Sequence, residues 1–93
     1  MELIEKERLA LSIVEILRRT HPTEDPAFIF FVYMKIWGGL DVVRQVLLEN
    51  MEQFFAEGRS SEDYRWLGRS MPDEILQQMY AEVSSEASEG ASA

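Results

Sequence analysis

The sequence predicts an all-α protein, a small bundle of about five helices, two of them short, around a central hydrophobic helix at residues 26–37. Three observations lead to this prediction. Apolar residues recur at helical spacing, capping residues with proline or glycine separate these segments, and only one segment is rich in strand-favouring residues. The 93 residues suffice for one domain with a single core.

The first predicted helix covers residues 2–20. Its apolar positions share one face: Leu9, Ala10, Ile13, Val14, Ile16 and Leu17. Arg18 and Arg19 suit the last turn, because cations there stabilise the helix dipole. The residue before a proline is pushed out of the α region, so His21-Pro22 should end the helix.

Residues 27–37, AFIFFVYMKIW, are the most apolar part of the chain, and Lys35 is their only charged residue. As a helix this stretch is apolar all round, which is typical of a buried helix. Asp25 suits the N-cap and Pro26 the first helical position, so we favour a helix. A buried strand is the alternative, since aromatic and β-branched residues favour strands.

Gly38-Gly39 should end the central helix. An amphipathic helix then follows over 41–57, with its apolar positions on one face: Val43, Leu47, Met51, Phe54 and Phe55. Gly58 is expected to close it at the C′ position.

A short helix is predicted to start at Ser60 and stop at Gly68, and a last one should start from Ser70 as N-cap and reach Val83. The run SSEASEGASA over 84–93 holds small and acidic residues without an apolar anchor. We therefore predict a helical domain at 1–83 and a disordered acidic tail at 84–93.

Composition excludes several classes of function. The chain has no cysteine, which excludes disulfides, thiolate catalysis and cysteine-based metal sites. Its net charge of −8 argues against a generic nucleic-acid binder. There is no secretory signal, and the longest apolar run is shorter than the roughly 20 residues that span a bilayer. We expect a cytoplasmic protein that does not bind membranes.

No motif indicates an enzyme. His21 with Glu24 and Asp25 is the best candidate for a metal site, but one histidine in a loop offers too few nitrogen or sulfur ligands. The pairs Glu62-Asp63 and Asp73-Glu74 are explained as carboxylates in the first turns of helices. Nucleotide-binding and nucleophile-elbow motifs are missing. We predict no catalytic residue, no metal site and no cofactor.

Two groups of residues are candidates for binding. A basic-aromatic cluster at 59–69 has three interpretations, namely core packing, a protein interface or nucleic-acid contact. With the central helix it supplies the interface candidates Tyr33, Met34, Trp37, Arg59, Tyr64, Arg65, Trp66 and Arg69. The candidates for a functional acidic surface are Glu49, Glu52, Glu57, Asp73, Glu74 and Glu82. A helix-turn-helix is rejected, because the would-be recognition helix at 41–57 is acidic.

We therefore expect a non-enzymatic protein-binding module or adaptor that acts by occlusion or scaffolding. The apolar excess of 27–37 suggests a homodimer that shares part of its core across a two-fold axis. The alternative is a small acidic inhibitor from a phage or mobile element, anti-CRISPR-like or transcription-inhibitor-like, that engages the basic groove of a host nucleic-acid-handling complex. An enzyme is the third class.

Overall fold

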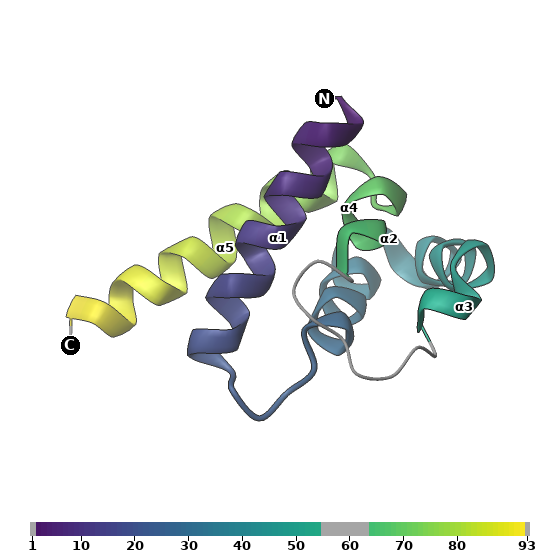
Figure 1. Ribbon diagram of the computed structural model, residues 1–93. Coiled ribbons are helices and arrows are strands. Elements are labelled where there is room, and N and C mark those ends of the chain that lie inside the picture. The colour runs from purple at the N-terminus through teal and green to yellow at the C-terminus, as the bar shows by residue number, and fades with distance from the viewer. Residues whose placement is uncertain (1, 55–63, 93) are drawn as a thin grey trace.

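The computed structural model describes residues 2–54 and 64–92, which form five helices and no strand (Figure 1). The helices are α1 (Leu3–Thr20), α2 (Pro26–Glu49), α3 (Met51–Phe54), α4 (Arg65–Ser70) and α5 (Asp73–Ser92). This confirms the all-α class and the choice of helix over strand for residues 27–37.

The first helix, α1, packs mainly against α4 and α5 (Figure 1). Its predicted apolar face is the buried one, with Leu9 half-buried at its edge and five buried side chains: Ala10, Ile13, Val14, Ile16 and Leu17. The helix ends at Thr20, directly before His21-Pro22, as the proline rule predicts.

Helix α2 starts at the predicted cap, but it bends at the glycine pair Gly38-Gly39 and continues to Glu49, whereas we predicted it to end there. Asp25 Oδ1 accepts a hydrogen bond from the Ala27 N–H at 2.8 Å, and Pro26 occupies the first turn. At Gly39 the backbone takes φ 80 and ψ 177, so two helical segments meet at a kink (Figure 1). A positive φ suits glycine, whereas its neighbour Gly38 stays helical.

The predicted helix 41–57 is interrupted. Its first part belongs to α2, which ends at Glu49, and α3 begins only after Asn50. Asn50 Nδ2 donates to the Val46 carbonyl at 2.9 Å and to Ser70 Oγ at 2.7 Å. An asparagine side chain that bonds to nearby backbone competes with the helix ladder, and the contact with Ser70 is not local in sequence. The last residues of the predicted helix lie outside the described residues.

The two last helices have different boundaries from those predicted. The predicted start of the short helix at Ser60 lies outside the described residues, and α4 runs through Gly68 to Ser70. Ser70 ends α4 and accepts the hydrogen bond from Asn50 instead of capping the next helix, which starts at Asp73.

The last helix extends beyond its predicted end. We predicted it to end at Val83, and the backbone of α5 is helical to Ser92. Ala87 packs against the core, so at least one turn beyond Val83 belongs to the fold. Alanine and glutamate are good helix formers, and extending an existing helix costs less than nucleating one.

One hydrophobic cluster forms the core, and no polar or charged residue that the structure describes is buried in it. Four helices contribute to it, and its largest fully buried side chains are Trp66, Phe30, Ile13, Leu17, Met34, Leu67, Met71, Leu76 and Met79. Ion pairs at the surface connect α1 to α5 and to α4. Lys6 Nζ lies 3.0 Å from Asp73 Oδ1, and Arg69 Nε lies 3.5 Å from Glu7 Oε1.

Candidate functional site

Helix α2 is buried on one side and exposed to solvent on the other. Phe30 and Met34 have no exposed surface. Phe28, Val32 and Ile36 are 61%, 39% and 64% exposed. These three residues, here called the outer stripe, are spaced by four and therefore form one line along the helix.

The outer stripe is more than a set of scattered surface residues. Single exposed apolar side chains are normal on any protein. Here three large ones are neighbours on the same helix, and Leu40 beyond the kink is 62% exposed as well. Continuous exposed apolar surface of this kind marks binding sites.

A shallow groove of about 230 Å³ runs beside the outer stripe and is here called the α2–α5 groove. Its apolar lining comes from one helix, α2: Phe28, Ile29, Val32, Tyr33 and Ile36. The polar lining is His21 and Glu24 from the α1–α2 loop and Glu86 from α5. The groove thus has an apolar wall and carboxylates at its rim.

Two carboxylates of α5 act on Tyr33 in the groove lining. Burial raises the pKa of the Tyr33 phenol, and the charges of Glu86 and Glu82 raise it further. The phenol therefore stays neutral and can donate a hydrogen bond. The Tyr33 ring stacks on Trp37, with the ring centroids 4.8 Å apart.

The interface candidates predicted on the central helix are distributed differently from the outer stripe. Tyr33 and Trp37 are half-buried, and only Tyr33 lines the groove. Met34 is fully buried in the core, so it presents no surface to a partner. The stripe was missed because a helix that is apolar all round carries no signal of which side faces out.

The basic-aromatic cluster at 59–69 is split between core and surface. Tyr64 and Trp66 are buried, which removes both rings from the surface. The Tyr64 hydroxyl donates to Asp25 Oδ1 at 3.0 Å and so ties the approach to α4 to the start of α2. Arg69 pairs with Glu7 on α1, Arg65 is exposed, and Arg59 lies outside the described residues.

The acidic candidates that the structure describes come from three helices, α2, α3 and α5. Glu49, Glu52, Glu74 and Glu82 are exposed, and Glu57 lies outside the described residues. Asp73 pairs with Lys6 on α1, and this hydrogen bond lowers the pKa of the Asp73 carboxyl. Among these candidates only Glu82 acts electrostatically on the groove, through Tyr33.

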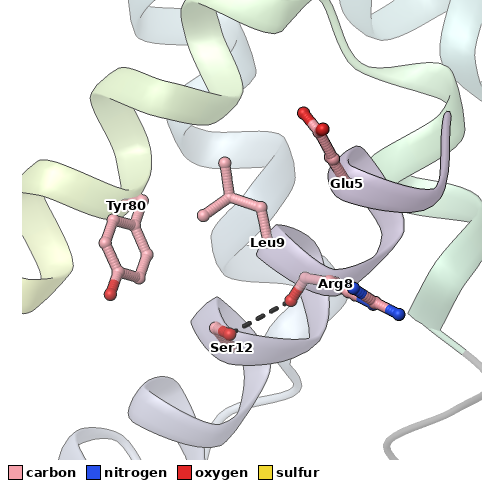
Figure 2. A pocket seen from close by; sticks show the side chains of 5 residues that line it. All are labelled: Glu5, Arg8, Leu9, Ser12 and Tyr80. Atoms are coloured by element: carbon pink, nitrogen blue, oxygen red, sulfur yellow. Dashed lines mark hydrogen bonds between the residues drawn. The ribbon is translucent and has the colours of Figure 1, made fainter. Parts of the chain in front are cut away.

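A second depression, of about 390 Å³, lies between α1 and α5 (Figure 2). It is lined by Glu5, Arg8, Leu9, Ser12 and Tyr80. Figure 2 shows Glu5 and Arg8 pointing away from each other. The Ser12 hydroxyl donates back to the Arg8 carbonyl at 3.1 Å. Catalytic sites need polar groups that converge on one point, and these do not.

Metal binding finds no support in the described ranges, where no three His, Asp or Glu residues lie close enough to hold an ion. His21 and Glu24 line the groove, and Asp25 accepts hydrogen bonds from Ala27 and Tyr64.

By length and composition, α2 could cross a membrane. Its most apolar window of 18 residues has a mean hydropathy of 1.4, and 28% of that window is buried in the fold. The core helix of a water-soluble protein meets the same criterion. The apolar stretch of α2 is interrupted by the kink at Gly39 and by the charged residues Asp41 and Arg44.

Comparison with known proteins adds no assignment: no family model, no curated protein and no solved structure matches this chain.

Proposed function

We propose that this chain is a non-enzymatic protein-binding module that docks a helical segment of a partner protein on the outer stripe of α2. One observation carries the proposal, namely that a helix with a fully buried inner side exposes three large apolar side chains in line on its outer side. By covering a segment of its partner, the module would act by occlusion or scaffolding.

The spacing supports a helical partner. Apolar side chains at i, i+4 and i+8 form the ridge that one helix presents to another. Phe28 and Ile36 are eight residues apart, which corresponds to about 12 Å along the helix axis. A partner helix needs about two turns to cover this length.

The free energy of binding that the outer stripe can supply is small. Burying one large apolar side chain contributes about 1.5–3 kcal/mol. Association costs at least about 4 kcal/mol in lost translational and rotational freedom. The outer stripe alone therefore supports weak binding, and a stable complex requires contacts at its edges as well.

A second copy of the chain is the competing occupant. The helices of a single chain already enclose the core, so the fold does not require a core shared between two copies. Self-association would instead pair two outer stripes. Light scattering after size exclusion at micromolar concentration distinguishes a monomer from a dimer.

Photo-crosslinking tests the proposed docking face. A photoreactive phenylalanine derivative replaces Val32 in the full chain, which is expressed in cells of its source. We expect a discrete crosslinked protein that is lost when Ile36→Ser is added, while circular dichroism shows that the variant remains folded.

The same photoreactive residue at Glu15, which is exposed on α1, serves as the control and should not give this product. The proposal fails if both positions give the same products, or if Ile36→Ser leaves the Val32 product unchanged.

A further inference from the structure

We infer that the partner segment is an amphipathic helix with Lys or Arg along one edge, seated on the outer stripe and in the α2–α5 groove with its basic edge against Glu82 and Glu86. This inference rests on the proposed function and specifies the chemistry of the partner.

The rim of the groove is acidic, and its carboxylates have no ion-pair partner in the part of the chain that the structure describes. Glu24 and Glu86 line the groove, and Glu82 lies one turn before Glu86 on α5. None of the three forms an ion pair with any residue that the structure describes. An incoming cation therefore gains an interaction without breaking one.

The two carboxylates on α5 act at the groove itself. Both raise the pKa of the Tyr33 phenol, which lines the groove beside Val32 and Ile36. A cation held near Tyr33 would meet two negative charges next to an apolar wall. An amphipathic helix combines these features, with apolar residues for the stripe and basic residues for the rim.

The charge pattern disfavours the competing occupants. A second copy would bring its own acidic rim, and the chain as a whole carries a net charge of −8. Like charges that meet across an interface weaken it. An anionic membrane surface would be repelled for the same reason. The groove is also smaller than the roughly 300–1,000 Å³ of typical small-molecule sites.

Lys35 puts a positive charge at the other edge of the outer stripe. It is exposed, and helical spacing puts it on the side of the stripe away from α5. The partner helix is therefore expected to carry its basic residues on the edge that meets α5. This asymmetry orients the partner on the stripe.

Two model peptides test the inference. Both are 18-residue amphipathic helices with the same leucine face, and their polar positions are Lys in one and Glu in the other. Fluorescence anisotropy measures binding to the full chain at low and high salt. We expect the leucine–lysine peptide to bind more tightly, and its affinity should fall at high salt and with Ile36→Ser.

A matched pair of double variants separates the rim from general charge attraction. E82Q/E86Q should weaken binding of the leucine–lysine peptide about threefold to tenfold, as expected for two exposed ion pairs. E49Q/E52Q removes the same charge from exposed positions outside the groove lining and should change affinity less than about twofold.

Several results would overturn the inference. Equal weakening by the two double variants shows attraction to net charge alone. Equal affinity for both peptides, or no affinity for either while the Val32 crosslink persists, overturns the basic partner and leaves the docking face standing. Dimerisation that is lost with Ile36→Ser assigns the stripe to a second copy. Sedimentation with zwitterionic vesicles that is lost with Ile36→Ser, without the Val32 crosslink, overturns both proposals.

Discussion

At the scale of single residues, a close approach between α4 and α1 depends on Gly68. A methyl group at this position would lie 2.9 Å from Ala10 Cβ and in contact with the Lys6 carbonyl. Both neighbours belong to α1, and a backbone carbonyl cannot move aside as a side chain can. Gly68 therefore permits α4 to lie directly on α1, and it does not end the helix as the sequence predicted.

The variant Gly68→Ala tests this packing. Because the added methyl group forces α4 away from α1, we expect the free energy of unfolding to fall by about 1–3 kcal/mol in urea denaturation. Gln77→Ala, an exposed change on α5, should alter it by less than about 0.5 kcal/mol. An unchanged or higher stability of Gly68→Ala would contradict the close contact.

At the scale of secondary-structure elements, the inner and outer sides of α2 have different roles. The inner side holds Ala27, Phe30 and Met34 in the core, and the outer side holds the outer stripe. Among the described helices, α1, α4 and α5 pack with one another and with the inner side of α2, and the three side chains of the outer stripe stay exposed. The same helix can thus stabilise the fold and remain available for a partner.

Two phenylalanines on α2 provide a matched comparison. Phe30 has 0% exposure and Phe28 has 61%. Phe30→Ala should lower the free energy of unfolding by about 3–5 kcal/mol, because it leaves a cavity in the core. Phe28→Ala should change it by about 0.5 kcal/mol or less. Equal losses for both variants in urea denaturation would show that α2 is rotated relative to the structure.

At the scale of the whole molecule, the N-terminal helix is tied to two later elements by charge. Lys6 on α1 pairs with Asp73 at the start of α5, and Glu7 pairs with Arg69 on α4. The Lys6 contact lowers the pKa of Asp73 in the folded state below its ordinary value of 3.8. The unfolded state therefore binds this proton more readily than the folded state.

The sign of the pH dependence follows from this difference. The pair stabilises the fold at pH values above the ordinary pKa of aspartate, and the stabilisation is lost as the pH falls through the lower folded pKa. Asp73→Asn should reduce the urea midpoint at pH 7, and the difference from the parent should vanish toward about pH 2. Gln77→Ala, an exposed change on α5 that removes no charge, should lack this dependence, and an equal effect would contradict the role of Lys6.

The fold class and several helix ends follow from local sequence. Pro22 stops α1, and Asp25 with Pro26 starts α2. Gly38-Gly39 was predicted to end the central helix, and α2 instead bends at Gly39 and continues to Glu49. These features depend on residues that are close in the chain, where steric limits and capping hydrogen bonds act without help from the rest of the protein.

Other features depended on contacts between distant residues. The Asn50–Ser70 bond accompanies the end of α2 and takes Ser70 away from its predicted capping role. Ala87 packs on the core and extends α5 beyond Val83. No periodicity within one segment reports a contact with another segment, so these boundaries were not predictable from the sequence.

The sequence by itself determined that residues 27–37 form an apolar helix, because its composition and its caps are local properties. Only the tertiary structure decided which side of that helix faces out. Packing against α1, α4 and α5 buried Phe30 and Met34 and left the outer stripe in solvent. A helix that is apolar all round has no preferred direction of its own, so the choice of side comes from the neighbours that cover it.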